Sequence, residues 1–124
     1  MIDAITVGEG LEKLGRQIQN EQIYEKYYQA KTTFENLDQQ TKTILAQAEI
    51  EVRNESKNIE IPITQVETTR FALTSGAYRK HIIALNDSRK EVNDTLAKVK
   101  SVELRIEVYR SLNRHLQSQD QFNS

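Results

Sequence analysis

Apolar residues recur every three or four positions through the first half of the chain, the spacing of one face of an α-helix. The stripe begins at Leu11 and keeps strictly alternating steps of three and four from Tyr27 to Ala48. A slip of phase precedes Tyr27, and no proline interrupts the stripe. The pattern therefore predicts one long helix over residues 10–56, with Gly15 as its weakest point.

This helical pattern stops at Pro62, which has no backbone N–H and crowds the preceding turn. Around the proline, Ile59, Ile61 and Ile63 alternate with other residues, as in a short extended segment. The segment can offer a strand edge to a partner, pair with a similar segment near the N-terminus, or pack against the end of the helices. The apolar residues of that N-terminal segment are Ile2, Ile5 and Val7.

A connector with a short helix is predicted over residues 57–75. Thr64 and Glu67 have the spacing of a capping box, which predicts a helix over residues 65–73. The Thr-Ser-Gly run at 74–76 ends that helix and caps the next one. The apolar residues that we expect the short helix to bury are Val66 and either Phe71 or Leu73.

A second long helix is predicted over residues 76–117, with a change in the phase of its apolar stripe at Val102. Residues 118–124 are polar and are expected to form a frayed tail. Two long helices joined by a connector that reverses direction should fold back as an antiparallel hairpin. The predicted fold is therefore all-α, a single helical domain over residues 1–124.

Both apolar stripes are narrow, about two positions in seven, so a lone hairpin leaves much apolar surface in water. We therefore expect the hairpins to assemble into a homo-oligomeric helical bundle. Arg89 falls at a seam position, where it either extends outward with its stem over apolar surface or pairs with an acid on a facing helix. The candidate seam residues are Tyr27, Phe34, Leu37, Ile44, Ile82, Leu85, Val92, Leu96, Val99 and Ile106.

The composition narrows the function classes. The chain has 124 residues, no Cys, 4 Gly and 1 Pro. The absence of Cys excludes disulfides, thiolate metal sites and cysteine nucleophiles. No apolar run approaches the roughly 18 residues of a membrane span, and the N-terminus lacks the features of a signal peptide. We therefore expect a soluble, cytoplasmic protein without a membrane partner, in the host cytoplasm if a phage encodes it.

Catalytic and metal-binding residues are sparse. The two histidines, His81 and His115, are too far apart for a helical metal pair, and neither follows a Glu at the three-residue spacing of di-iron bundles. No phosphate-binding glycine loop or nucleophile motif occurs. We interpret His81 as a flanking or hydrogen-bonded histidine, and we expect a non-enzyme with no metal and no cofactor.

Charge is divided unevenly along the chain. Residues 1–70 contain 8 Lys and Arg against 12 Asp and Glu, and residues 71–124 contain 9 against 6. A basic second helix could follow a phosphate backbone, with a base stacked on Tyr109 between guanidinium groups. Alternatively, its cations offset the helix dipole or pair with the acidic first helix. The candidate nucleic-acid-binding residues are Arg79, Lys80, Lys98, Arg105, Tyr109, Arg110 and Arg114.

The run Arg-Ile-Glu-Val-Tyr-Arg-Ser at 105–111 ends a long helix that starts near Tyr78. Over residues 64–116 the chain resembles small all-helical bacteriophage proteins encoded beside homologous-recombination genes. This end also distantly resembles the phage recombination mediators of the UvsY type, which are helical, form rings, bind single-stranded DNA and load a recombinase. The positions that match are Arg105, Tyr109 and Arg110.

Two functional hypotheses follow. The first is a phage-type accessory protein of DNA recombination, which binds single-stranded DNA or a recombinase as an oligomer through its second helix. The second is a protein-binding module with no nucleic-acid role, such as a phage inhibitor of a host defence complex or an assembly chaperone. In that case the acidic first helix would be the working surface.

Overall fold

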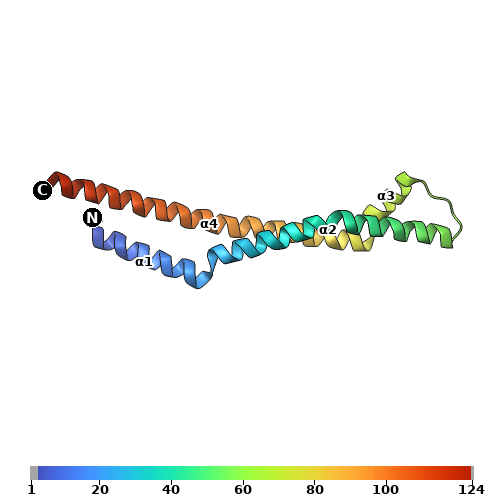
Figure 1. The fold of residues 1–124 in the computed structure, drawn as a ribbon, viewed down its shortest axis with the longest axis horizontal. Coiled ribbons are helices and arrows are strands. Elements are labelled where there is room, and N and C mark those ends of the chain that lie inside the picture. The colour runs from blue at the N-terminus through green and yellow to red at the C-terminus, as the bar shows by residue number, and fades with distance from the viewer. Residues whose placement is uncertain (1–2, 124) are drawn as a thin grey trace. The chain divides into compact units, whose positions relative to one another are not determined.

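A computed structural model describes residues 3–123 of the chain. Over this range the backbone forms helices and short connections, with no strand (Figure 1). The predicted all-α class is confirmed. The helices are α1 (Ala4–Glu21), α2 (Ile23–Asn58), α3 (Gln65–Leu73) and α4 (Gly76–Asn123).

The chain divides into two compact units. The terminal unit comprises Met1–Gln29 and Asn93–Ser124, and the connector unit comprises Ala30–Val92. Both α2 and α4 contribute residues to each unit.

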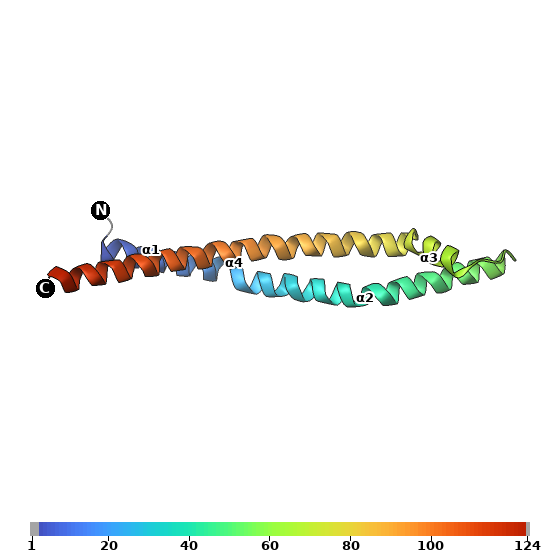
Figure 2. The same ribbon diagram turned by 90° about the horizontal axis from the view of Figure 1, so that it is seen from above.

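In the terminal unit, α1 lies antiparallel to the C-terminal half of α4 (Figure 2). The Tyr109 ring lies against Gly10, and the Arg105 guanidinium donates a hydrogen bond to Gln17 Oε1 at 3.3 Å. Between these helices and the start of α2 is a small apolar core. Its buried residues are Leu14, Ile23, Val99 and Val102.

In the connector unit, α2 and the first turns of α4 are also antiparallel, and α3 lies beside α2 (Figure 1). Thr41 Oγ1 is 2.9 Å from His81 Nε2, and the Arg89 guanidinium lies 5.4 Å from the centre of the Phe34 ring. The Arg89 guanidinium thus makes a cation–π contact with an aromatic ring of α2. The two interpretations of Arg89 stay predictions. The two polar contacts show antiparallel packing within this unit.

The prediction of one helix over residues 10–56 is wrong. Helix α1 begins at Ala4, where the Asp3 carboxylate accepts a hydrogen bond from the Thr6 N–H at 2.8 Å. The helix ends at Glu21, and the next residue, Gln22, caps it with a left-handed backbone of φ 50° and ψ 48°. This break, and not Gly15, accounts for the slip of phase, because it turns the apolar stripe so that both Leu14 and Ile23 reach the core.

The predicted N-terminal extended segment is also corrected. Ile5 and Val7 lie in α1, and Val7 is buried there, while Ile2 lies outside the described residues. The strand pairing with residues 59–63 is therefore not formed by any described residue. The apolar positions 4, 7, 11 and 14 follow helical spacing, which explains why this segment joins α1.

The left-handed residue gives the first testable expectation. Replacing Gln22 by Gly should raise the free energy of unfolding by about 1 kcal/mol, because only glycine adopts this backbone without strain. Gln19→Gly, inside α1, is the matched control and should lower it by a similar amount of about 1 kcal/mol. Urea unfolding followed by circular dichroism measures both, and the same sign for both variants would contradict the break at Gln22.

Helix α3 has the predicted bounds, and both hydrogen bonds of the predicted capping box between Thr64 and Glu67 are present. The residues expected to be buried are not. Val66, Phe71 and Leu73 are exposed, and the buried positions are Thr68 and Ala72. Helix α3 packs through these two small residues, and its large apolar side chains are left in contact with solvent.

The last helix begins at Gly76 as predicted. Ser75 caps it, since its hydroxyl accepts a hydrogen bond from the Tyr78 N–H at 3.3 Å. It continues to Asn123, beyond the predicted end at residue 117, so residues 118–123 are helical and not a frayed tail.

The predicted seam residues are buried to different degrees. Leu85 and Val99 are buried, and the other predicted seam residues are only partly buried. Tyr27 and Ile106 pack against the core of the terminal unit. The change of stripe phase is confirmed there, because Val99 and Val102 are both buried.

Candidate functional site

The most distinctive surface of the connector unit is an apolar groove between the end of α2, the connection that follows it, and α3. Its apolar lining residues, which define the groove, are Val52, Ile59, Ile61, Pro62, Ile63 and Phe71. Its volume is about 460 Å³. Three of the lining side chains, Ile59, Ile61 and Phe71, are between 48% and 60% exposed, so large apolar side chains surround an open space.

A backbone motif at the end of α2 places these isoleucines. Glu60 is left-handed with φ 58°, its N–H donates to Lys57 O at 3.2 Å, and the Ile61 N–H donates to Ser56 O at 3.1 Å. These are the two hydrogen bonds of a Schellman motif, which closes the helix end and turns the chain. The Ser56 hydroxyl also donates to the Ile61 carbonyl. Pro62 follows and prevents further helix.

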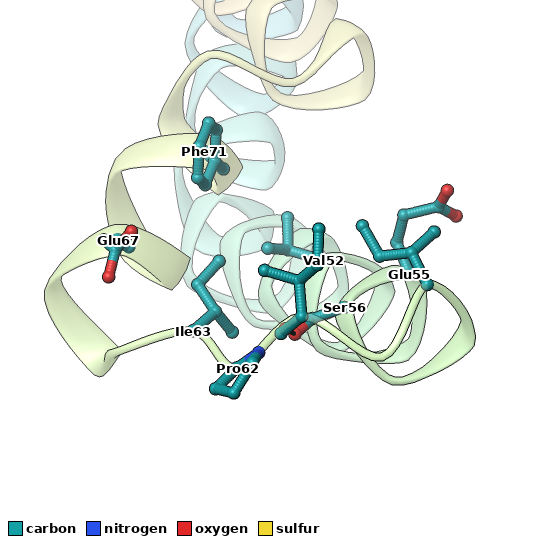
Figure 3. Close-up of a pocket in the computed structure, with 9 residues that line it drawn as sticks. Val52, Glu55, Ser56, Pro62, Ile63, Glu67 and Phe71 are labelled. Atoms are coloured by element: carbon teal, nitrogen blue, oxygen red, sulfur yellow. Dashed lines mark hydrogen bonds between the residues drawn. The ribbon is translucent and has the colours of Figure 1, made fainter.

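Helix α3 closes the other side of the groove. Figure 3 shows Phe71 on α3 and Val52 on α2 at its two sides, with Pro62 and Ile63 of the connection between them. Helix α3 is tied to α2 by polar contacts, in which the Thr69 hydroxyl donates to Glu49 Oε1 at 3.3 Å and the Arg53 guanidinium donates to Gln65 Oε1.

Both charged residues that line the groove are carboxylates. Glu55 and Glu67 lie on opposite sides of it (Figure 3). Hydrogen bonds from the hydroxyl and then the N–H of Thr64 lower the pKa of Glu67, so this carboxylate stays ionised at neutral pH. Its Oε1 atom accepts both of these hydrogen bonds, whereas Glu55 is exposed at the rim. A guanidinium, that of Arg70, lies 5.4 Å from the centre of the Phe71 ring.

The predicted nucleic-acid-binding residues are divided between the units. Arg79 and Lys80 are exposed in the connector unit, and the remaining five belong to the terminal unit. Arg114 makes its hydrogen bonds within α4, where it donates to Glu107 Oε1 at 3.2 Å and to Ser111 Oγ at 3.3 Å. Arg105 is held by Gln17 of α1, and Lys98 and Arg110 are exposed.

The Tyr109 ring packs against α1. A Cβ atom built on Gly10 would come within 2.6 Å of the Tyr109 ring, so the hydroxyl end of the ring lies directly against the α1 backbone. Tyr109 is half-buried beside the core of the terminal unit. Its role as a stacking surface for a base stays a prediction.

The uneven charge along the chain is offset by the packing. The connector unit contains nine Lys and Arg residues and nine Asp and Glu residues. The terminal unit contains eight and nine respectively. Neither unit is net basic, since the acidic first half of the chain contributes to both.

The histidines have local roles. His81 is 7% exposed and is hydrogen-bonded to Thr41, which confirms that it is a satisfied histidine. His115 is exposed beside Gln119, with 3.2 Å between His115 Nε2 and Gln119 Nε2. Within residues 3–123, no three His, Cys, Asp or Glu residues lie close enough together to hold a metal ion.

The sequence indicated part of this groove. The alternating isoleucines around Pro62 suggested a segment that meets a partner or packs on the helix end. It did not indicate that Phe71 and Val52 complete a groove, because the pattern predicts that the short helix buries either Phe71 or Leu73. The signal available was the wide spacing of large apolar residues on so short a helix, which exceeds what one face can bury.

Of the helices that the structure describes, none has the length and apolar character needed to cross a membrane. No family model, curated protein or solved structure matches the chain. The resemblance to phage recombination proteins therefore stays a prediction.

Proposed function

We propose that the chain is a non-enzymatic protein-interaction module, and that its apolar groove is the docking site. The observation that carries this proposal is the grouping of Ile59, Ile61 and Phe71, each about half exposed, around a space of about 460 Å³. Scattered exposed apolar residues are ordinary on a protein surface, whereas several around one concavity are typical of binding sites. The second functional hypothesis from the sequence thus receives the better support, with a different working surface.

The lining defines the chemistry of the partner. Apolar walls favour large aliphatic or aromatic side chains, such as those on one face of an amphipathic helix. The carboxylates of Glu55 and Glu67 favour a Lys or Arg beside them. A groove of this size accepts only two or three side chains, so the affinity expected is weak, roughly micromolar.

Two designed peptides test the proposal. Both are amphipathic helices with leucines four residues apart; one carries Lys beside the leucines and the other carries Glu. We expect the Lys peptide to bind the full chain and the Glu peptide to bind at least about tenfold more weakly, because of repulsion by the rim carboxylates. Fluorescence anisotropy of labelled peptides measures both affinities.

Two substitutions on α3 locate the binding. Phe71→Asp places a charge in the groove and should abolish binding of the Lys peptide. Val66→Asp is the matched control, since Val66 is 79% exposed on the same helix but does not line the groove, and it should leave binding unchanged. Absence of binding to the wild-type chain, or equal binding to both variants, would contradict the proposal.

Single-stranded DNA binding is a second proposal, favoured by the exposed Lys98 and Arg110 on α4. The partial burial of Tyr109 against α1 and the balanced charge of each unit give it less support. In the same anisotropy assay, a labelled oligonucleotide that bound at about 50 mM salt and dissociated at about 200 mM would identify phosphate contacts and favour this second function.

A further inference from the structure

We propose that the groove binds a second copy of this chain, through the exposed face of α4 that carries Leu104 and Val108. This inference rests on the proposed function and names its partner. The donor residues belong to the terminal unit and the groove to the connector unit. Each copy therefore carries both halves of the contact.

The donor face has the chemistry that the groove selects. Leu104 is 66% exposed and Val108 is 50% exposed, and both lie on the same face of α4 because they are four residues apart. Among the large apolar residues most exposed in the described chain, they form the one pair with this helical spacing. Other exposed apolar residues on the helices, such as Ile5, Tyr28 and Ile83, have no exposed large apolar residue four positions away. Isolated residues of this kind are ordinary on a protein surface.

Charge complementarity supports the same occupant. Lys100 precedes Leu104 by one turn, so Lys100, Leu104 and Val108 form one row along the exposed side of α4. The exposed carboxylate at the groove rim belongs to Glu55. With Leu104 and Val108 in the groove, the Lys100 ammonium of one copy meets the Glu55 carboxylate of the other.

Two acids flank the donor row, since Glu103 and Glu107 each precede a donor residue by one position. Glu107 is paired with Arg114 at 3.2 Å, and this pairing limits its repulsion of the groove carboxylates. An acidic or uncharged partner helix would gain only the apolar contact. A second copy supplies both the apolar pair and the cation.

Sedimentation of full-length variants tests the contact. We expect the wild-type chain to associate between about 1 and 200 µM, and Phe71→Asp or the double variant L104Q/V108Q to raise the dissociation constant at least about tenfold. An equimolar mixture of these two variants should form a 1:1 complex, because one retains the donor face and the other retains the groove. All altered side chains are about half exposed or more, and circular dichroism checks that helix content is kept.

A charge exchange tests the pairing of Lys100 with Glu55. Each of K100E and E55K should weaken association, and the variant that carries both should recover it, since the charges then meet in reverse. The matched control is E51K, because Glu51 is exposed one turn before Glu55 on α2 but does not line the groove. E51K with K100E should give no recovery.

Three results would overturn the inference. They are a wild-type chain that stays monomeric over the whole range, a mixture that fails to form the 1:1 complex, and a charge exchange without recovery. A monomeric chain whose groove still binds the Lys peptide would refute the second copy while the proposed function stands. A chain that neither associates nor binds the peptide would refute both.

Discussion

Replacing Leu14 by Ala is expected to lower the free energy of unfolding by about 2–4 kcal/mol, the largest effect of any single truncation proposed for this chain. Leu14 is 1% exposed and packs with Ile23, Val99 and Val102. The core of the terminal unit is small, so neighbouring side chains have little freedom to close the cavity that the substitution leaves. Urea unfolding followed by circular dichroism measures the change.

Ile5→Ala is the matched control on the same helix. Ile5 is 72% exposed, and its truncation should change the free energy of unfolding by less than about 0.5 kcal/mol. Equal losses for the two variants would show that α1 does not pack in the observed orientation.

The second large effect is expected at the buried polar pair of the connector unit. Thr41→Val keeps the shape of the side chain but removes the hydroxyl that meets His81 Nε2 at 2.9 Å. Because His81 is 7% exposed, its ring nitrogen loses its partner without gaining water, and the free energy of unfolding should fall by about 1–3 kcal/mol. Thermal and urea unfolding both report this loss.

Two further variants isolate the hydrogen bond from the packing. Thr43→Val, at an exposed position of α2, should have little effect. The double variant T41V/H81L replaces both partners by apolar groups and should be more stable than T41V alone. If T41V is as stable as the wild-type chain, the pair does not stabilise the connector unit.

The long helices were predictable because their apolar residues keep a helical period over many turns. The bounds of α3 were predictable for a different reason, which is that Thr64 and Glu67 specify a capping box locally. The break at Gln22 was not, since no glycine, proline or asparagine stands there to mark a left-handed residue. The only sign of this break in the sequence is the slip in the phase of the apolar stripe before Tyr27.

The hydrophobicity of the α3 side chains does not predict which of them are buried. Phe71 and Val66 outrank Thr68 and Ala72 on any apolar scale, yet the smaller pair is buried. Which face of a short helix packs depends on how closely α2 and α4 approach it, and that is a tertiary property. The groove exists because the large side chains were left outside.

The prediction of a basic binding helix also rests on the sequence alone, because it comes from counting charges along the chain. Counting along the chain separates an acidic half from a basic half, but folding puts residues of both halves into each unit. Arg105 then meets Gln17 of the other half, and Arg114 pairs with Glu107 two turns earlier on α4, contacts that a linear count does not identify. Local motifs were therefore better guides here than summed charge.

The most direct test of the groove is an NMR titration of the isotope-labelled L104Q/V108Q variant, which keeps the groove but lacks the donor face, with the Lys peptide. We expect the amide chemical shifts that change to lie in residues 52–71, centred on Ile59, Ile61 and Phe71. Shifts that change instead along residues 98–114 of α4, or no change at saturating peptide, would show that the groove is not the docking site.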